Sequence, residues 1–286
     1  MRRSRAAIGV LTLAAMSLAA CGGNDVRDSA PSGSVSVPDL PGDPVPRPEA
    51  RSRYGNGPVY EVLGQTYRVM DSSLGYKERG VASWYGKKFH GRLTSNREPY
   101  DMYEMTAAHK TLPLPTYVKV RNLRNNRSII VRVNDRGPFV HNRIIDLSYA
   151  AALKLDMIRD GTSLVEVTAI SFDEPRGDRP VRFVEPAEPP ASNPAPAPEP
   201  ESQPAAKQEN EIFVQVGAFG DRTNAERRRS ALLSGGIGDA FIFADEASTP
   251  PIYRVRIGPI AGVDDYDALV MKLEALGITD PYLITL

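Results

Sequence analysis

Apolar positions divide the chain into two patterned regions, from about residue 60 to 170 and from 212 to 286. In the first region, short runs rich in β-branched and aromatic residues alternate with polar positions and turn residues. The runs that predict strands are 81–85, 117–120, 128–133 and 164–170. One helix is clear, because Ser148 can cap the run 149–155. Many short strands with one or two short helices predict a small β-barrel.

The second region contains an internal repeat. Six residues recur 41 positions later: Val214, Gly217, Leu232, Gly236, Ile237 and Asp239 return as Val255, Gly258, Leu273, Gly277, Ile278 and Asp280. Each half predicts a strand, a helix and a strand. In the first half these are 212–217, about 224–233 and 240–243. In the second half they are 252–257, about 264–276 and 282–285. Two such units predict a four-stranded antiparallel sheet with both helices on one face, as in ferredoxin-like folds. The other face is then open to a ligand.

The N-terminus has the pattern of an export signal over residues 1–20. Three arginines precede an apolar run, 6–20, which is too short to span a bilayer comfortably and is followed by Cys21. A cysteine directly after such a run resembles the bacterial lipoprotein signal, in which this thiol is acylated. Gly22, where an aspartate would favour retention in the inner membrane, predicts an outer-membrane anchor facing the periplasm. The alternative is ordinary secretory cleavage with an incidental cysteine.

Two segments lack the apolar residues that a core needs. Residues 21–57 are rich in Gly, Pro, Ser and Asp and predict a flexible tether. Residues 173–211 predict a linker, since 8 prolines and 6 glutamates lie within 185–211. The chain is therefore expected to comprise a signal (1–20), a tether (21–57), a barrel (58–172), a linker (173–211) and a C-terminal domain (212–286).

Charge changes this picture only locally. The 35 Lys and Arg balance the 35 Asp and Glu, but residues 80–170 hold 14 basic and 8 acidic residues. A basic domain suggests an anionic ligand, and a solvated basic surface is the plain alternative. Nucleic acid is one such ligand, but an exported protein is not expected to meet it. Cys21 is the only cysteine, so no internal disulfide can form, and with three scattered histidines we expect no metal site and no cofactor.

Several motifs between residues 80 and 148 together resemble the rare lipoprotein A (RlpA) family. They are GVASWYG at 80–86, FHG at 89–91, YDM at 100–102, TAAH at 106–109, TLP at 111–113, VNDRGPF at 133–139 and RIIDLS at 143–148. The resemblance implies a double-psi β-barrel, a fold shared with expansins. FVQVGAF at 213–219 and YRVRIGP at 253–259 look like a SPOR domain. That likeness implies binding to denuded peptidoglycan, the glycan strands stripped of stem peptides that are enriched at the division septum.

Characterised relatives in this family are lytic transglycosylases, which cleave the MurNAc–GlcNAc β-1,4 bond and form 1,6-anhydroMurNAc. The reaction needs one carboxyl group that protonates the leaving oxygen and then deprotonates the 6-hydroxyl, whereas a hydrolase needs a second carboxylate. By resemblance, Glu98, His109 and Asp135 fall on positions considered important in the family. Asp146 matches the motif of the catalytic aspartate in expansin-like barrels. Asp135 is the first choice for the acid, and Asp101 is expected to be structural.

Each candidate also has a purely structural interpretation. Asp135 could be an ordinary turn residue, Asp146 could hold the loop before the helix cap, and His109 could be a buried core histidine. One position departs from the family pattern, since Arg97 stands where the family has glycine. Arginine adopts positive φ less readily than glycine, so the departure predicts an altered turn around Glu98.

Candidates for substrate binding come from both domains. Trp84 and Tyr85 offer a stacking platform for sugar rings, although neighbours on a strand face opposite sides and only one can readily face a cleft. The lactyl carboxylate of each MurNAc would suit arginine side chains. The expected residues are Arg132, Arg136 and Arg143 in the barrel, with Gln215, Arg254 and Arg256 on the open face of the C-terminal sheet.

The sequence therefore predicts an outer-membrane lipoprotein that acts as an endolytic transglycosylase on denuded glycan at the septum. One alternative is a non-catalytic glycan-binding or expansin-like wall-loosening protein. Another is a hydrolase, which differs only in its product. The expected partners are denuded glycan strands, the outer membrane through a lipid on Cys21, and divisome proteins or amidases.

Overall fold

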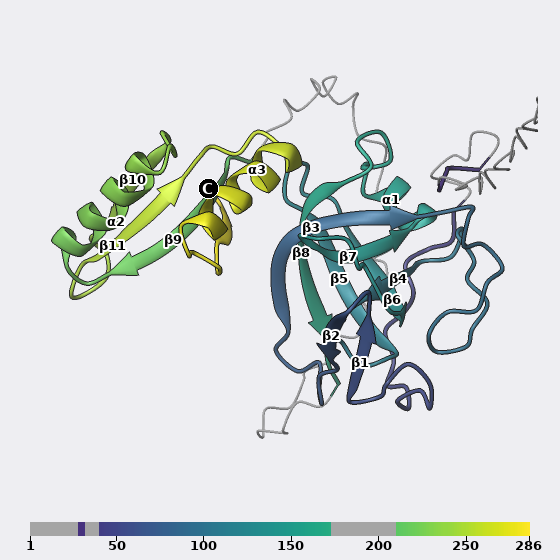
Figure 1. Cartoon of the computed structure of the whole chain (residues 1–286). Helices are drawn as coiled ribbons and strands as arrows, with labels where there is room; N and C mark the ends of the chain where they lie inside the picture. Colours follow the sequence, from purple (N-terminus) through teal and green to yellow (C-terminus); the bar gives the residue numbers. More distant parts are fainter. Residues whose placement is uncertain (1–27, 32–39, 173–209) are drawn as a thin grey trace, which may run out of the picture.

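The computed structural model describes residues 28–31, 40–172 and 210–286. They form two domains, a barrel drawn in blue to teal and a smaller domain drawn in green to yellow (Figure 1). The predicted signal at 1–20, Cys21 and most of the predicted linker lie outside the described residues. Among the helices of the described part, none has the length and apolar character needed to cross a membrane.

The first domain is a closed barrel of six strands. The strands are β3 (Lys77–Tyr85), β4 (Thr106–His109), β5 (Thr116–Asn122), β6 (Ser128–Asp135), β7 (Arg143–Ser148) and β8 (Ser163–Ile170). Around the barrel they lie in the order β3, β7, β4, β6, β5, β8. The pairs β3/β7 and β4/β6 are parallel, and the other pairs are antiparallel. The predicted barrel is confirmed, and closure leaves none of these six strands as an edge.

Alternating apolar residues fill the interior of the barrel. Fully buried members of this interior cluster are Val118, Val120, Val131, Val133, Ile145, Leu147, Val165 and Val167. Because side chains alternate between the two faces of a strand, the residues between them point outward. The outward-facing positions at the ends of β3, β6 and β7 are the ones that carry the candidate site.

The helix α1 (Tyr149–Lys154) follows β7 directly and begins where the sequence predicts. Ser148 is its N-cap, and the Ser148 hydroxyl oxygen accepts a hydrogen bond of 3.2 Å from the backbone N–H of Ala151. Ahead of the barrel, β1 (Val59–Val62) and β2 (Gln65–Arg68) form a two-stranded hairpin that the sequence pattern did not predict.

Residues 40–57 lie against the barrel, although their composition predicts a flexible tether. The Asp43 carboxylate accepts a hydrogen bond of 2.7 Å from a backbone N–H of β6, and the Glu49 carboxylate binds an arginine of the same strand. The Asn56 amide exchanges hydrogen bonds of 2.7 and 2.8 Å with the backbone at Leu114. The tether prediction is therefore wrong for this part, because polar side chains, with Leu40 packed against the barrel core, attach it to the barrel. We call residues 40–57 the N-terminal strap.

The second domain has the predicted two-unit architecture. Its elements are β9 (Ile212–Phe219), α2 (Arg222–Ser234), β10 (Ala240–Asp245), β11 (Ile252–Ile257), α3 (Val263–Ala275) and β12 (Tyr282–Thr285). The sheet is antiparallel throughout, in the order β10, β11, β9, β12. Apolar residues of both helices join those of the sheet in one buried cluster, which leaves the opposite face of the sheet without helices.

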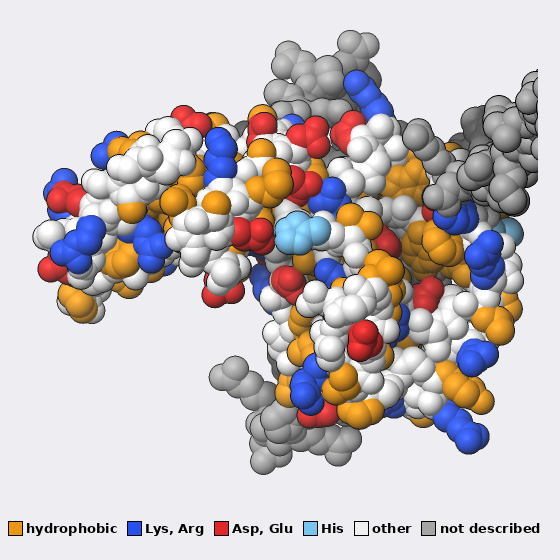
Figure 2. Space-filling model, in the orientation of Figure 1, with side chains coloured by type: hydrophobic (Ala, Val, Ile, Leu, Met, Phe, Trp, Pro, Cys, Tyr) orange, Lys and Arg blue, Asp and Glu red, His pale blue; other side chains and the backbone are white. Residues whose placement is uncertain are grey.

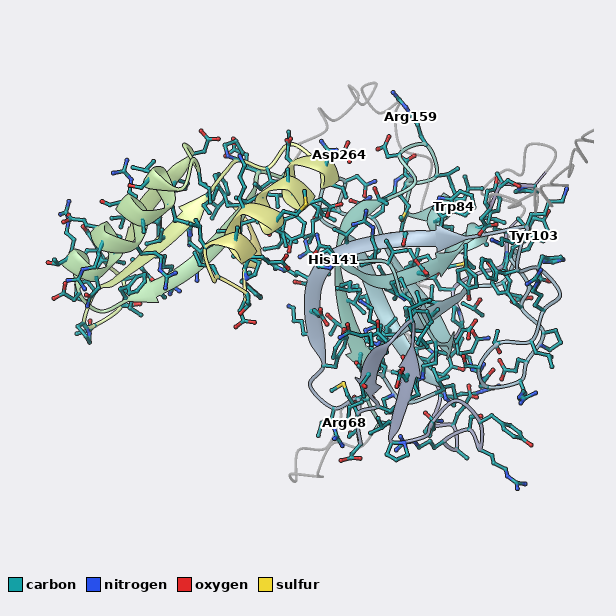
Figure 3. The ribbon with its side chains drawn as sticks, viewed as in Figure 1. Arg68, Trp84, Tyr103, His141, Arg159 and Asp264 are labelled. Atoms are coloured by element: carbon teal, nitrogen blue, oxygen red, sulfur yellow. The ribbon has the colours of Figure 1, made fainter. Side chains whose placement is uncertain are left out.

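The two domains contact each other through polar and apolar residues. The Arg143 guanidinium lies 3.0 Å from the carboxylate of Asp267 in α3, and Arg79 donates a hydrogen bond of 2.9 Å to the backbone oxygen of Leu283. Val81, Leu123 and Leu164 of the barrel join the core cluster of the second domain. Trp84 lies toward the end of β3 that points away from the second domain (Figure 3).

Charges of both signs are interspersed on the face that Figure 2 shows, over the barrel and over the second domain. The local basic excess of residues 80–170 does not gather into a single patch on this face. Anion binding at the candidate site would therefore depend on individual basic side chains and their partners, and not on a broad basic surface.

Candidate active site

The strand register brings the two candidate aspartates to one level of the barrel. Asp135 in β6 pairs with Ala108 in β4, and Ala108 pairs on its other side with Asp146 in β7. Asp146 in turn pairs with Ser83 in β3. We call these four residues the aspartate row. Asp146 faces outward, because Leu147 beside it belongs to the interior cluster. Asn134 is an extra residue at a register shift between β4 and β6, and the charges of Asp135 and Asp146 both act on Tyr85, which places the two aspartates on one side. Two strand spacings put the two aspartate Cα atoms about 10 Å apart.

Asp146 has the environment of a proton-holding carboxyl group. It is partly buried and accepts a short hydrogen bond from the Ser83 hydroxyl. Burial raises the pKa of Asp146 above its ordinary value, and the Ser83 bond and nearby positive charges oppose that rise only in part. Gly137 lies close above it, since a Cβ there would be 3.7 Å from Asp146 Oδ2. A raised pKa makes a carboxyl group a better proton donor at neutral pH than an ordinary aspartate.

Asp135 fastens a loop. Its Oδ1 accepts three hydrogen bonds, from the Ser95 N–H at 2.8 Å, the Ser95 hydroxyl at 2.6 Å and the Arg136 N–H at 2.7 Å. The loop that carries Glu98 is thereby tied to the end of β6. An asparagine at position 135 has an oxygen that can accept the same three bonds, so the role of holding the loop does not require a charge.

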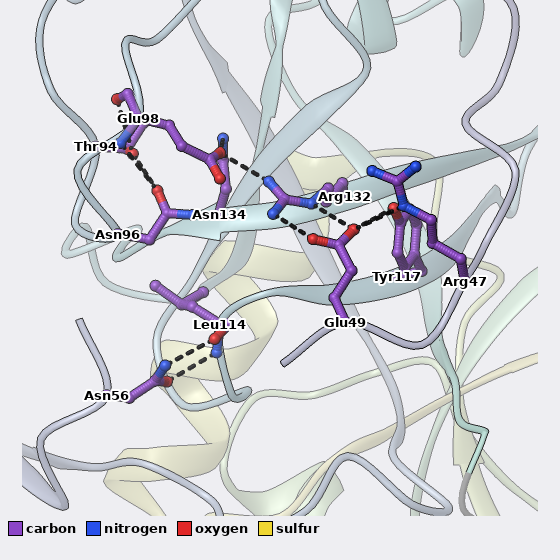
Figure 4. Close-up of polar contacts among 10 residues, drawn as sticks. All are labelled: Arg47, Glu49, Asn56, Thr94, Asn96, Glu98, Leu114, Tyr117, Arg132 and Asn134. Carbon is purple, nitrogen blue, oxygen red and sulfur yellow. Dashed lines mark hydrogen bonds and ion pairs between the residues drawn. The ribbon is translucent and has the colours of Figure 1, made fainter. Parts of the chain in front are cut away.

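Glu98 is a carboxylate close to the aspartate row, with one of its two oxygens bound by neighbouring donors. Its Oε2 accepts hydrogen bonds from Arg132 at 2.7 Å and from the Asn134 amide at 3.0 Å (Figure 4). Burial by itself would raise the pKa of Glu98, but these hydrogen bonds lower it overall. On its other side, Arg132 binds both carboxylate oxygens of Glu49 from the strap, at 2.8 and 3.1 Å. Glu98 is therefore a stable negative charge and a poor proton donor.

The turn before Glu98 has the left-handed backbone that glycine favours, although arginine occupies it. Arg97 has a φ of 73°. The turn is closed by hydrogen bonds from the Arg97 N–H to the Thr94 oxygen and from the Thr94 N–H to the Glu98 oxygen, at 2.9 and 2.8 Å. The arginine itself takes the strained conformation, at a cost of about 1 kcal/mol. Its guanidinium lies over the ring of Tyr54 in the strap, 5.3 Å from the centroid.

His109 is buried and organises the backbone around it. Its Nδ1 accepts hydrogen bonds from the N–H groups of Thr111 and Leu112 at 3.2 and 3.0 Å, and its Nε2 lies 2.7 Å from the Tyr76 hydroxyl. Burial lowers the pKa of His109 to about 3, and two neighbouring cations add to the shift. The imidazole is therefore neutral. As the residue after Ala108, it points to the face opposite the aspartate row.

The predicted carboxylate-binding arginines of the barrel are all engaged within the protein. Arg136 donates to backbone oxygens at Gly55 and Leu112, at 2.8 and 2.6 Å. Arg143 pairs with an aspartate of α3, and Arg132 lies between two glutamates. In this structure Arg136 fastens the strap to the loop after β4. A direct role of these arginines in substrate binding stays a prediction.

Trp84 and Tyr85 face opposite sides of β3, as strand alternation predicts. Tyr85 is 7% exposed and stacks on Tyr100 with ring centroids 4.1 Å apart. Burial raises the pKa of Tyr85 well above its ordinary value, and the negative charges of both row aspartates add to the shift. Trp84 is partly buried and meets Tyr149 edge to face at 5.7 Å. Of the two, Trp84 retains more surface for a ligand, whereas Tyr85 lies beside the row.

Sequence reasoning missed several partners of the carboxyl groups, namely Glu49, Ser83, Ser95 and Asn134. Ser83 had a usable signal, because it lies two residues before Tyr85 and so shares its strand face. Glu49 had no such signal, since its contact depends on where the strap crosses β6.

Asp101 accepts a hydrogen bond of 2.9 Å from the Tyr103 N–H within one turn. In the part of the chain that the structure describes, no three His, Cys, Asp or Glu side chains are grouped to hold a metal ion.

The polar candidates of the second domain share the sheet face without helices. Arg256 pairs with Gln215, and Arg254 lies two residues away on the same strand face. Phe241 and Phe243 of β10 pair with these arginines and share the face. Arg256 is only 7% exposed, its Nε and Nη1 have no partner among the described residues, and its guanidinium lies 4.2 Å from the Phe243 centroid. Buried N–H groups without a hydrogen-bond acceptor are unfavourable, which marks Arg256 as a ligand-binding candidate.

Comparison with known proteins first defines the class. Residues 77–167 match the family model described as "Lytic transglycolase", and residues 209–285 match the model of the SPOR domain. The protein thus joins a double-psi β-barrel of the lytic transglycosylase type to a SPOR domain.

The relatives then define the family. The chain is 38% identical over 290 residues to the endolytic peptidoglycan transglycosylase RlpA of Pseudomonas aeruginosa (strain UCBPP-PA14), across 90% of this chain and 84% of the relative. It is 53% identical over 153 residues to the protein of that name from Vibrio cholerae, across 54% of this chain and 57% of the relative. The chain belongs to the RlpA family. A crystal structure of the RlpA SPOR domain from Pseudomonas aeruginosa aligns with 26% identity and a TM-score of 0.24, over 26% of this chain and 96% of that one.

Proposed function

We propose that this protein is an endolytic peptidoglycan transglycosylase in which Asp146 is the acid–base group. Membership of the RlpA family and the lytic transglycosylase model over the barrel support the activity. The observation that carries the choice of acid is the raised pKa of Asp146 at the outward face of the barrel. Asp135, the first choice from sequence, is proposed to hold the Glu98 loop instead, because three donors from that loop and from Arg136 bind its Oδ1.

The reaction uses one carboxyl group twice. Protonated Asp146 donates its proton to the glycosidic oxygen while the bond from that oxygen to C1 of MurNAc breaks. The 6-hydroxyl of the same MurNAc attacks C1, and the Asp146 carboxylate accepts the proton of that hydroxyl. The 1,6-anhydro ring closes without water and Asp146 is protonated again. The hydrogen bond from Ser83 stabilises the carboxylate that exists between the two proton transfers.

Glu98 and Asp135 are proposed to act through charge and position. As the C1–oxygen bond breaks, positive charge develops on the sugar ring, and a fixed negative charge nearby stabilises it. Glu98 suits this role because its hydrogen bonds keep its pKa low. Asp135 holds the loop that carries Glu98 at the end of β6. His109, neutral and turned away from the row, is proposed to position the backbone after β4.

The SPOR domain is proposed to bind denuded glycan and thereby to concentrate the enzyme at the division septum. A glycan strand without stem peptides still carries a lactyl carboxylate on each MurNAc. Arg256 is buried beside Phe243, and its Nε and Nη1 have no hydrogen-bond partner in the described part of the chain, which supports a ligand of this kind. Gln215 and Arg254 are proposed to contact the same strand, although Arg254 also pairs with Asp245 at 2.8 Å.

The N-terminal sequence supports a protein anchored in the outer membrane by lipid on Cys21 and facing the periplasm. In that location, the substrate and the SPOR ligand are both within reach of the two domains. Divisome proteins or amidases are proposed as partners, because amidases remove stem peptides and so generate denuded glycan.

The proposed activity is tested by incubating the purified mature protein with peptide-free glycan and determining the masses of the products. Ends that carry 1,6-anhydroMurNAc are expected. Hydrated reducing ends would instead indicate a hydrolase with Asp135 as the second carboxylate. Retained glycan binding with neither product would support the non-catalytic, expansin-like alternative.

A further inference from the structure

The turn that follows β3 holds a carboxylate with its backbone. The N–H of Gly86 donates to Oδ2 of Asp28 at 2.8 Å, and the N–H of Lys88 donates to Oδ1 of the same carboxylate at 3.0 Å. Between them, the N–H of Lys87 donates to the backbone oxygen of Ser29 at 3.0 Å. Three successive backbone N–H groups thus point at one acidic segment, and both oxygens of its carboxylate are bound.

The glycine in this turn lets a carboxylate approach the backbone closely. A Cβ at Gly86 would lie 2.5 Å from the Ser29 oxygen and 2.8 Å from Cζ3 of Trp84, so a larger residue would block the contact. Successive backbone N–H groups in a turn form a concave anion site whose donors are fixed in place. This geometry distinguishes a carboxylate, with two acceptor oxygens, from a neutral hydroxyl.

The turn also lies close to the proposed acid. Gly86 follows Ser83 by three strand residues, which is about 10 Å along β3, and Trp84 lies between them. Burial is the main cause of the raised pKa of Asp146, and the negative charge of Asp28 adds to the rise. An anion seated in the turn therefore favours the protonated form of Asp146, which the first proton transfer requires.

We propose that the turn 86–88 is the subsite that binds the lactyl carboxylate of the glycan strand, and that Asp28 occupies it in the absence of substrate. The inference rests on the proposed function. It explains why Arg132, Arg136 and Arg143 can remain engaged within the protein, since backbone donors supply the anion contact. Asp28 and Ser29 are exposed and belong to the segment ahead of the strap, so substrate can replace them without opening the barrel.

Binding at this subsite can be followed directly, because Trp84 is the only tryptophan and lies against Gly86. Tryptophan fluorescence of the full-length mature protein in detergent is titrated with N-acetylmuramic acid and with its methyl ester, which keeps the size but not the charge. The acid is expected to bind and the ester is not. Equal responses to the two would overturn the proposal.

Two pairs of variants test whether Asp28 competes with the ligand and whether the backbone N–H groups of the turn bind it. Asp28→Ala is expected to tighten binding of N-acetylmuramic acid by about threefold or more, because it removes the internal competitor. Asp43→Ala, which removes a strap acid bound to β6 instead, is expected to leave the affinity unchanged. Lys88→Pro removes the N–H that reaches Oδ1 and is expected to abolish binding, whereas Lys88→Ala keeps that N–H and the binding.

Equal affinity in Asp28→Ala and Asp43→Ala would overturn the proposal, whether or not Lys88→Pro folds. The titration needs no turnover, so its result is separate from that of the activity assay. Failure to form anhydro ends with intact, charge-dependent binding would contradict the proposed activity alone. Normal anhydro formation with charge-independent binding would contradict the subsite alone.

Discussion

At the scale of single residues, the carboxyl groups of the barrel are distinguished by the donors around them. Glu98 and Asp135 each accept hydrogen bonds that favour or tolerate a negative charge, whereas Asp146 accepts a single bond from a neutral hydroxyl and is mainly affected by burial. The pKa of Glu98 is lowered and that of Asp146 is raised, and such opposite shifts separate the roles of two carboxyl groups in acid–base chemistry.

Asparagine substitutions at the two row aspartates test this assignment. Asp146→Asn removes the proton shuttle, so we expect the rate of anhydro-end formation to fall by at least about 10²-fold. Asp135→Asn keeps an oxygen that accepts the three loop bonds, so we expect its rate to stay within about tenfold of the wild type, or about 1.4 kcal/mol in barrier. Initial rates and melting temperatures are measured on both variants. The opposite ranking of rates in two folded variants would return the acid role to Asp135.

The buried histidine gives a prediction about pH. The pKa of His109 is about 3 in the folded protein and ordinarily 6.5. Below about pH 6.5, the unfolded chain therefore binds a proton at His109 that the folded protein does not bind. The stabilisation that comes from neutral His109 is lost as the pH falls from 6.5 toward 3, by up to about 1.4 kcal/mol per pH unit. His109→Asn keeps an acceptor for the backbone N–H groups but cannot take up this proton.

We expect urea unfolding at pH 7 and at pH 4.5 to show a smaller loss of stability on acidification for His109→Asn than for the wild type, by about 2 kcal/mol. An identical pH dependence of the two proteins would show that His109 is not buried in its neutral form.

At the scale of elements, the N-terminal strap behaves as part of the barrel. Its polar side chains bond to strand backbone and to Arg132, and Arg132 in turn holds Glu98. The strap, although low in apolar residues, is therefore linked through Arg132 to Glu98, a candidate catalytic carboxylate.

Loss of the strap contact should weaken both the fold and the site. Glu49→Ala leaves the partly buried Arg132 with one carboxylate instead of two, so we expect a loss of about 1–3 kcal/mol in the free energy of unfolding and a lower rate of glycan cleavage. Arg47→Ala is the control, because Arg47 is 75% exposed and lies 3.6 Å from Glu49. Its cost should be within about 0.5 kcal/mol. Equal costs in urea unfolding would mean that the strap contact adds nothing to stability.

The open face of the SPOR sheet gives a second prediction at this scale. Arg256→Met keeps the apolar packing on Phe243 but removes the charge, so binding of denuded glycan to the full-length protein should weaken by about tenfold or more, as for loss of a charge-assisted hydrogen bond. Melting temperature should stay the same or rise, because two buried nitrogens of Arg256 have no hydrogen-bond partner among the residues that the structure describes. Arg227→Met on the exposed side of α2 is the control. Unchanged pull-down of glycan by the Arg256 variant would exclude this residue from the binding face.

At the scale of the whole molecule, the two domains contact each other through Arg79, near the start of β3, and through Arg143 of β7, which pairs with Val81. Arg143, one of the arginines expected to bind substrate, is held by α3 in this contact. The aspartate row and the turn 86–88 belong to the barrel alone and involve no residue of the second domain among their described contacts.

The proposed anchor belongs to this scale too. Cys21→Ala should move the protein from the membrane to the soluble periplasmic fraction, because stable anchoring needs more than one acyl chain and the variant has none. Gly22→Asp keeps the cysteine and should shift the protein toward the inner membrane. Fractionation of cells followed by immunoblotting measures both effects. Persistence of Cys21→Ala in the membrane pellet would contradict the lipoprotein assignment.

The sequence by itself determined the features that depend on neighbouring residues. The alternating runs predicted four of the six barrel strands, namely β3, β5, β6 and β8, but not β4 or β7. Ser148 predicted the start of α1, and the 41-residue repeat predicted the second domain almost element by element. Periodicity and capping act within a few residues, so they can be read without tertiary structure. The family motifs likewise marked the carboxyl groups, though not their roles.

Only the tertiary structure decided which groups surround those carboxyl groups. Asp146 lies beside Ser83, 63 residues away in sequence, and Asp135 is covered by Ser95, 40 residues away. Burial and hydrogen-bond donors set a pKa, and both are supplied by distant segments. For the same reason composition misjudged the strap, because it measures the capacity to form a core and not the hydrogen bonds by which Glu49 reaches Arg132 across 83 residues of chain.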